Sequence, residues 1–182
     1  FFFFFIMEKI GIDIVGVIMK RSPLSDLLRI YNGDIPLQLC KGIPETYGIV
    51  KAVNGIVNRF RQENVFIVSS ADDLLRRTIL HWLEKNNILK RTGACTKNLI
   101  FCKERKEKAI VCAQRGITQF IDDRREVLHH IHESDPSIKL ILFNPDEKEG
   151  CEFRTHQKHF TILADPGRIF GVIMDNIQFK RA

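Results

Sequence analysis

Hydrophobic and polar positions follow two different periods along this chain. Short apolar runs rich in β-branched residues occupy residues 9–14, 65–68, 98–102, 117–121 and 138–143. Between these runs, apolar residues recur at helical spacing over residues 46–62, 104–114 and 124–132, and at Leu75, Ile79, Trp82 and Leu83. The short runs predict buried strands, and the helical spacing predicts amphipathic helices with one apolar stripe. We therefore expect a strand followed by a helix, repeated four times.

This repeated unit predicts the fold class. Strands that are joined by crossover helices run parallel, and the helices cover both faces of the sheet. The expected architecture is α/β, a Rossmann-like three-layer sandwich with a central parallel sheet. The chain has 182 residues, of which 45% are hydrophobic, which is enough for one core. We expect residues 7–182 to form a single domain, with residues 144–182, whose pattern is unclear, as an extension of it.

Two local signals predict where helices begin and end. Ser70, followed three residues later by Asp73, is typical of a helix start, with Ser70 capping the first turn. Gly116 follows a predicted helix, at the position where a left-handed residue often ends one.

The amino-terminal residues 1–6 are unusual because five consecutive phenylalanines begin the chain. They have neither the basic region nor the cleavage site of a signal peptide. We expect an artefactual or disordered extension with Met7 as the true start; a short membrane anchor is the alternative. No apolar run approaches the roughly 20 residues of a membrane helix, so we expect a cytoplasmic protein without membrane association.

The cysteines support the same compartment. None of the five forms a CxxC pair, and they occupy positions Cys40, Cys95, Cys102, Cys112 and Cys151. Structural zinc sites usually use closely spaced pairs, and disulfide frameworks belong to oxidising compartments. We therefore expect buried or inert thiols in a reducing cytoplasm.

The positive charge is local. The formal net charge is +6, yet residues 76–108 alone hold ten basic and three acidic residues. This segment contains only two aromatic residues, Trp82 and Phe101, so base stacking has little to use. We interpret the charge as the surroundings of an anion site. Nucleic acid remains a possible partner that is not favoured.

Histidines cluster at two places. His129, His130 and His132 lie in one predicted helix, where positions 129 and 132 share a face, and His156 and His159 follow later. Neither group has the glutamate of an HExxH motif or neighbouring cysteines, which zinc sites of these types contain. We expect surface histidines.

Polar residues follow several predicted strands at the point where each strand ends. Asp13 follows the first strand and Ser69 follows the second. Asp122 and Asp123 follow the fourth strand, and Lys108 lies in the helix that joins the third strand to the fourth. Each of these residues alone is typical of a cap, a turn or a solvated charge. Because ligands bind beyond the carboxyl ends of parallel strands, their matching positions indicate a functional site.

Four motifs make the chain similar to the haloacid dehalogenase superfamily over about residues 8–143. They are GIDIVGVI at the first strand, FIVSSA at the second, KERKEKA around the lysine and FIDDR after the fourth strand. The resemblance is to small members without a large cap domain and implies a haloacid dehalogenase-like fold. Most members of the superfamily are magnesium-dependent phosphatases.

The resemblance also implies roles for individual residues. Asp13 would be the nucleophile that becomes aspartyl-phosphate. Ser69 would donate to a phosphoryl oxygen, and Lys108 would offset the negative charge of the phosphoryl group and of Asp13. The loop containing Gly16 would direct backbone N–H groups toward the phosphate.

The implied cofactor is Mg²⁺, which prefers oxygen ligands. Its ligands would be the carboxylates of Asp13, Asp122 and Asp123 and the backbone carbonyl of Val15. Family phosphatases usually have an aspartate at the position of Val15 as general acid and base, and loss of such a group costs roughly 10² to 10⁴ in rate. Carbon–phosphorus and carbon–halogen hydrolases and cation-pumping ATPases of the superfamily also lack it.

The resemblance therefore implies a hydrolase that acts on a phosphate ester in a phosphorylated small molecule or another anionic substrate, with weakened acid/base catalysis. A pseudoenzyme that binds a phosphorylated ligand or partner is the first alternative. Nucleic-acid end processing or binding is the second.

Overall fold

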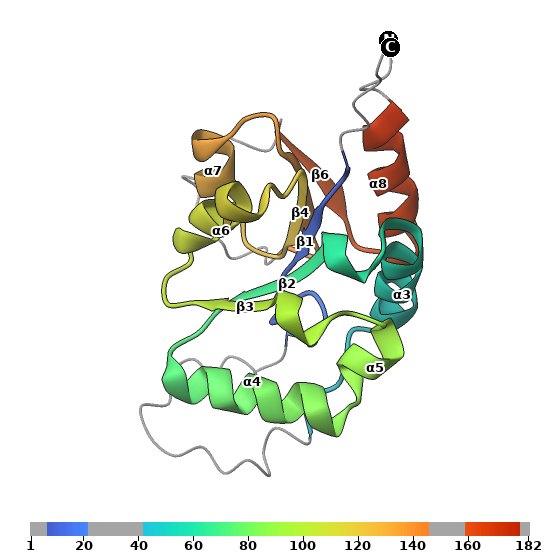
Figure 1. Cartoon of the computed structure of the whole chain (residues 1–182), viewed down its shortest axis with the longest axis vertical. Helices are drawn as coiled ribbons and strands as arrows, with labels where there is room; N and C mark the ends of the chain where they lie inside the picture. The colour runs from blue at the N-terminus through green and yellow to red at the C-terminus, as the bar shows by residue number, and fades with distance from the viewer. Residues whose placement is uncertain (1–6, 22–41, 146–158, 179–182) are drawn as a thin grey trace.

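The computed structural model describes residues 7–21, 42–145 and 159–178 of the chain. Its centre is a sheet of parallel strands in the order β3-β2-β1-β4-β5-β6 (Figure 1). The strands are β1 (Ile10–Ile12), β2 (Val65–Ser70), β3 (Leu99–Cys102), β4 (Gln119–Asp122), β5 (Lys139–Phe143) and β6 (Phe160–Leu163). The parallel sheet predicted from the apolar runs is confirmed.

Helices cover both faces of this sheet, so the predicted three-layer α/β sandwich is also confirmed (Figure 1). One layer contains α3 (Ile49–Phe60), α4 (Asp73–Lys85), α5 (Ile88–Thr92) and α8 (Ile169–Gln178). The other layer contains α6 (Glu107–Arg115) and α7 (Arg125–Ser134). Short 3-10 turns connect these elements at η1 (Gln62–Asn64), η2 (Thr96–Asn98) and η4 (Pro166–Arg168).

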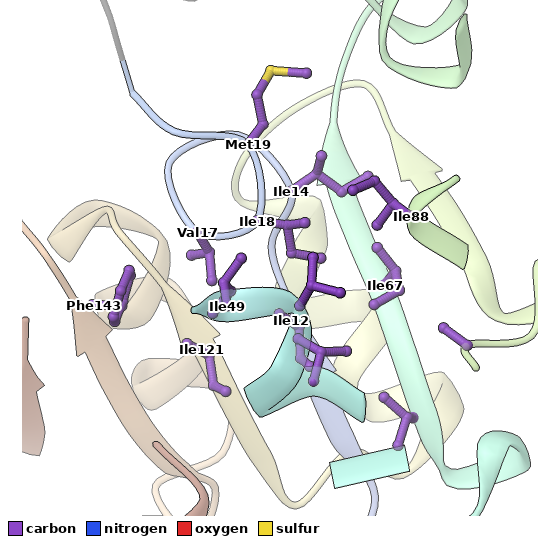
Figure 2. Close-up of a cluster of buried hydrophobic side chains, with 14 of the residues drawn as sticks. Ile12, Ile14, Val17, Ile18, Met19, Ile49, Ile67, Ile88, Ile121 and Phe143 are labelled. Atoms are coloured by element: carbon purple, nitrogen blue, oxygen red, sulfur yellow. The ribbon is translucent and has the colours of Figure 1, made fainter. Parts of the chain in front are cut away.

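The two faces of the sheet bury different side chains because successive residues of a strand point in opposite directions. Ile12 and Ile121 pack with Ile49 of α3 in the first core cluster (Figure 2). Phe120 packs with Leu128 of α7 in the second. Each fully buried side chain of this size contributes about 1.5–3 kcal/mol to folding. The central strands are therefore fixed from both sides.

The loop after β1 belongs to the core as well. Ile14, Val15, Ile18 and Met19 are all buried, and Figure 2 shows Ile14 and Ile18 near Ile12. The Ile14 carbonyl accepts hydrogen bonds from the N–H groups of Ile18, at 2.9 Å, and Met19, at 2.8 Å. The sequence just after the first strand is thus held in a tight, buried turn.

One predicted helix cap is wrong. The residue that caps α4 is Asp72, whose side chain accepts a hydrogen bond from the Leu75 N–H at 2.8 Å. Ser70 instead is the last residue of β2 and pairs with Cys102 of β3. Pairing with β3 extends β2 two residues beyond its predicted end. The cap of α4 therefore lies at Asp72, two residues after the predicted position. The predicted stop at Gly116 is confirmed, because this residue has φ +65°.

The carboxy-terminal residues supply elements that the pattern did not predict. Strand β6 pairs with β5, with Phe143 opposite Leu163, and α8 packs in the first helix layer. Residues 1–6 and the predictions for Cys40, Cys151 and His156 lie outside the described residues. Within the described residues, no helix is long and apolar enough to cross a membrane.

Candidate active site

The strand order reverses between β1 and β4, and the polar residues found in the sequence meet at their carboxyl ends. Strands β1 and β4 are paired, and the Asp13 N–H donates to the Ile121 carbonyl at 2.9 Å. Asp13 therefore follows β1 directly beside Asp122, the last residue of β4. Such a reversal point is where open parallel sheets bind ligands.

Lys108 joins these two aspartates. It lies in the first turn of α6, and its Nζ donates to Asp13 Oδ1 and to Asp122 Oδ2, both at 2.7 Å. The three side chains are almost completely buried, at 2%, 4% and 0% exposure. Charge-assisted bonds of this length hold the Asp13 carboxylate in one orientation.

The charge of Lys108 is stable in this environment. Burial by itself lowers the pKa of Lys108, but the charges of Asp122 and Asp13 and the hydrogen bonds that they accept outweigh burial. The pKa of Lys108 is consequently raised above its usual value. Lys108 is therefore an ammonium group at neutral pH.

Asp122 and Asp123 have different partners. Asp122 Oδ1 accepts a hydrogen bond from the Arg124 N–H at 2.9 Å, which anchors this carboxylate to the start of α7. Asp123 forms an ion pair with Arg21, which lies just after the buried turn. Arg21 was not predicted as a site residue, because no motif or periodicity links a lone arginine to an aspartate 102 positions away.

Gly16 makes room for Asp123. It has φ +106°, and a Cβ at this position would lie 1.9 Å from Asp123 Oδ2. The Gly16 N–H donates to the Met19 carbonyl at 2.8 Å, so this amide is engaged within the turn. The observed role of Gly16 is close packing, and a phosphate contact of its amide would require this hydrogen bond to break.

The three aspartates fit a magnesium ion in donor type and spacing. Asp13, Asp122 and Asp123 each offer a carboxylate oxygen, and these oxygens lie within 4.8 Å of one another. All three residues are buried, and hard carboxylate oxygens are the ligands that Mg²⁺ prefers. Lys108 and Arg21 now contact these carboxylates, so a bound ion would use carboxylate oxygens that the two cationic side chains do not occupy.

Ser69 and Val15 complete the set of predicted residues. Ser69 is buried near the end of β2, which pairs with β1, but among the described residues its hydroxyl has no hydrogen bond to the Asp13–Lys108 group. Val15 is only 3% exposed, packs in the first core cluster and bridges to Met19. Its side chain is therefore part of the core that supports the site.

Burial makes two thiols near Lys108 weakly acidic. Burial raises the pKa of Cys102 to about 11 and that of Cys112 to about 12, with a smaller opposing effect from Lys108. Cys95, Cys102 and Cys112 are all free thiols. Cys102 and Cys112 agree with the expectation of buried or inert cysteines.

The two aromatic residues of the basic segment 76–108 have contacts within the protein. Trp82 is buried, and its indole N–H donates to the Ile43 carbonyl at 2.8 Å. The guanidinium of Arg76 lies 5.3 Å from the centre of the Phe101 ring.

The histidines form no three-ligand cluster among the residues that the structure describes. His129 lies near Glu133, with 3.4 Å between Nε2 and Oε1. His132 stacks on His159, with ring centres 4.1 Å apart.

Comparisons with known proteins show similarity in fold. No family model matches the chain, and neither does any curated protein sequence. A solved structure described as a dehalogenase with an intermediate complex aligns with 91% of this chain and 96% of its own, at a TM-score of 0.57 and 9% identity. At this identity the similarity concerns backbone architecture alone. The chain therefore has a Rossmann-like α/β fold shared with a dehalogenase.

Proposed function

We propose that this protein is a hydrolase of the haloacid dehalogenase type that uses Asp13 as a nucleophile on a phosphate ester. The observation that carries this proposal is the buried Asp13–Lys108–Asp122 group at the carboxyl ends of two paired strands. A carboxylate attacking an anionic phosphate needs fixed positive charge nearby. Lys108 supplies it without needing to move, since it already contacts Asp13 at 2.7 Å.

In the proposed reaction, an Asp13 oxygen attacks phosphorus, the ester oxygen leaves with its electron pair, and an aspartyl-phosphate forms. Water then attacks phosphorus, releases inorganic phosphate and restores Asp13. Lys108 orients Asp13 throughout, and the Ser69 hydroxyl would donate to a phosphoryl oxygen. Mg²⁺ held by Asp13, Asp122, Asp123 and the Val15 carbonyl would supply further positive charge against the phosphoryl oxygens.

Val15 narrows the class of substrate. An apolar side chain cannot protonate a leaving group, so esters of poorly acidic alcohols would react slowly. Esters whose leaving group needs no proton, such as aryl phosphates and acyl phosphates, avoid this limitation. We therefore propose an activated phosphate monoester as the preferred substrate.

The test uses purified protein, Mg²⁺ and 4-nitrophenyl phosphate. Wild type should release phosphate, and Asp13→Asn, which keeps size and hydrogen bonding but is a far weaker nucleophile, should abolish the release. If neither wild type nor Asp13→Asn releases phosphate from a broad panel of activated phosphates, the proposal that this protein is an enzyme is wrong.

Variants at position 15 distinguish an active phosphatase from a pseudoenzyme that only binds a phosphorylated ligand. Val15→Asp would introduce the missing acid/base group, whereas Val15→Asn introduces similar bulk and polarity without a titratable proton. Because Val15 is buried among apolar residues, both variants should lose stability. A turnover at least about a hundredfold higher in the aspartate variant than in the asparagine variant would indicate an otherwise complete phosphatase site. No difference, together with Mg²⁺ binding, would favour a binding role.

Attack at carbon is the second candidate function. It is favoured because Lys108 and Arg21 already pair with all three aspartates, so the site is partly neutralised by the chain itself. The similarity in fold to a dehalogenase points the same way. In this reaction Asp13 displaces halide from carbon to form an ester, which water then hydrolyses. Asp13-dependent halide release from short 2-haloacids in the presence of EDTA would support it.

A further inference from the structure

Arg21 occupies the same carboxylate that the proposed function assigns to a metal. Its guanidinium is paired with Asp123, and the Asp123 side chain is 1% exposed. We propose that Arg21 is a displaceable counter-ion of Asp123 that sets the affinity of the site for a divalent cation. This inference rests on the proposed function, because it concerns the same three aspartates.

Competition for one carboxylate supports an exchange. The Arg21 guanidinium is paired with Asp123 Oδ2, on one of the three aspartates that offer oxygens to a cation. A guanidinium and a divalent cation at the same buried carboxylate repel each other strongly in low-dielectric surroundings. Metal binding at Asp123 is therefore coupled to departure of the guanidinium.

The two cationic side chains differ in their freedom to leave. Lys108 is 2% exposed and contacts two carboxylates, so its departure would strand two buried charges. The side chain of Arg21 is 15% exposed and so reaches solvent. The backbone just before it is held, because the Lys20 N–H donates to the Pro44 carbonyl at 2.9 Å. An exchange therefore requires movement of the Arg21 side chain and no rearrangement of the buried turn.

The shape of the site keeps Asp123 available after the exchange. Asp123 Oδ2 lies against Gly16, where a Cβ would collide with it. The oxygen that Arg21 contacts is thus confined to a narrow space next to the turn. Loss of Arg21 should leave this carboxylate in place, close to Asp13 and Asp122, with its charge less compensated.

The test measures Mg²⁺ binding by isothermal titration of metal-free full-length protein at fixed ionic strength. Arg21→Gln should bind Mg²⁺ about ten- to a hundredfold more tightly than wild type, the range expected for removing one competing hydrogen bond between charged groups. Arg91→Gln is the matched control, because Arg91 forms its ion pair with Glu45 at an exposed position and none with the three aspartates. It should bind Mg²⁺ like wild type.

Thermal unfolding gives a second readout, which also covers poor folding of the first variant. Metal-free Arg21→Gln should melt below wild type and gain more from added Mg²⁺, because tighter binding stabilises the folded state more. Arg21→Lys keeps the charge but loses the planar guanidinium, so its Mg²⁺ affinity should lie between those of wild type and the glutamine variant.

Other outcomes separate the two proposals. Equal or weaker Mg²⁺ binding by both Arg21 variants would overturn the counter-ion role while leaving the phosphatase proposal in place. Tighter binding by Arg21→Gln, together with phosphate release that does not depend on Asp13, would overturn the proposed function and support the counter-ion. If wild type and both variants bind no Mg²⁺, the counter-ion role of Arg21 and the Mg²⁺ site of the proposed function are both overturned.

Discussion

The buried lysine allows the sharpest quantitative prediction. Lys108 and Lys106 lie two residues apart and form ion pairs of nearly equal length, 2.7 Å to Asp13 and 2.8 Å to Glu104. Their surroundings differ, since Lys108 is 2% exposed and Lys106 is 67% exposed. Replacing each lysine with methionine keeps an unbranched apolar side chain and removes the charged ammonium group. The comparison therefore isolates the effect of burial.

Lys108→Met should lower the free energy of unfolding by about 3–5 kcal/mol, because it leaves two buried carboxylates without their shared partner. This is a large part of the roughly 5–15 kcal/mol that stabilises a typical domain. Lys106→Met should leave stability close to that of wild type, because solvent already screens its ion pair. Equilibrium urea unfolding at pH 7, followed by circular dichroism, measures both.

The double variant Lys108→Met/Asp13→Asn provides an internal check. Removing one carboxylate relieves part of the repulsion, so the double variant should be more stable than Lys108→Met alone, with a coupling of about 0.5–3 kcal/mol. Equal stability of Lys108→Met, Lys106→Met and wild type would refute the reasoning that burial makes this ion pair important.

The pH dependence follows from the raised pKa of Lys108. A pKa that is higher in the folded than in the unfolded state stabilises the fold fully below the ordinary lysine value of about 10.4, and this stabilisation disappears as the pH rises through the folded-state value. The stability difference between wild type and Lys108→Met should therefore not decrease from pH 7 to pH 9. A steady decrease across this range would show that Lys108 loses its proton much earlier.

Three further predictions concern the turn, a helix cap and the thiols. Gly16→Ala should cost at least about 1–3 kcal/mol through backbone strain at φ +106° and displace the carboxylate that packs against it; Gly171→Ala, where a Cβ meets nothing within 4 Å, should instead stabilise α8 by up to about 1 kcal/mol in thermal unfolding. Asp72→Ala should cost about 0.5–2 kcal/mol in urea unfolding by removing the cap of α4, and no loss would contradict the cap. Cys102 should react with a disulfide reagent at pH 8 on the order of a hundredfold more slowly than an ordinary thiol, and Cys112 more slowly still, because burial raises the pKa of both; rapid labelling of the native protein would contradict this.

Much of the fold was predictable because buried parallel strands are continuous apolar runs. The segments that form β2 and β5 contain such runs, at residues 65–68 and 138–143, and were found. Strand β6 was not, because it lies at the edge of the sheet and buries Phe160 and Leu163 while Thr161 and Ile162 are exposed. Neither the alternation of a half-buried strand nor a continuous apolar run marks such a segment.

The site divides in the same way. Asp13 and Asp122 were predictable because each follows its own strand, and parallel strands bring their carboxyl ends together. The KERKEKA motif then identified Lys108 as the positively charged residue that joins these two aspartates. Arg21 was not predictable, since its pairing with Asp123 depends on how the turn after β1 folds into the core. This is a tertiary contact without a local signal.

The central claim is that Asp13 is a nucleophile, and the most direct measurement is mass spectrometry of protein quenched with acid during turnover of an aryl phosphate with Mg²⁺. The peptide that contains Asp13 should carry a phosphoryl group in wild type, and it should carry none in Asp13→Asn. Steady phosphate release without any adduct on this peptide, retained in Asp13→Asn, would contradict the account.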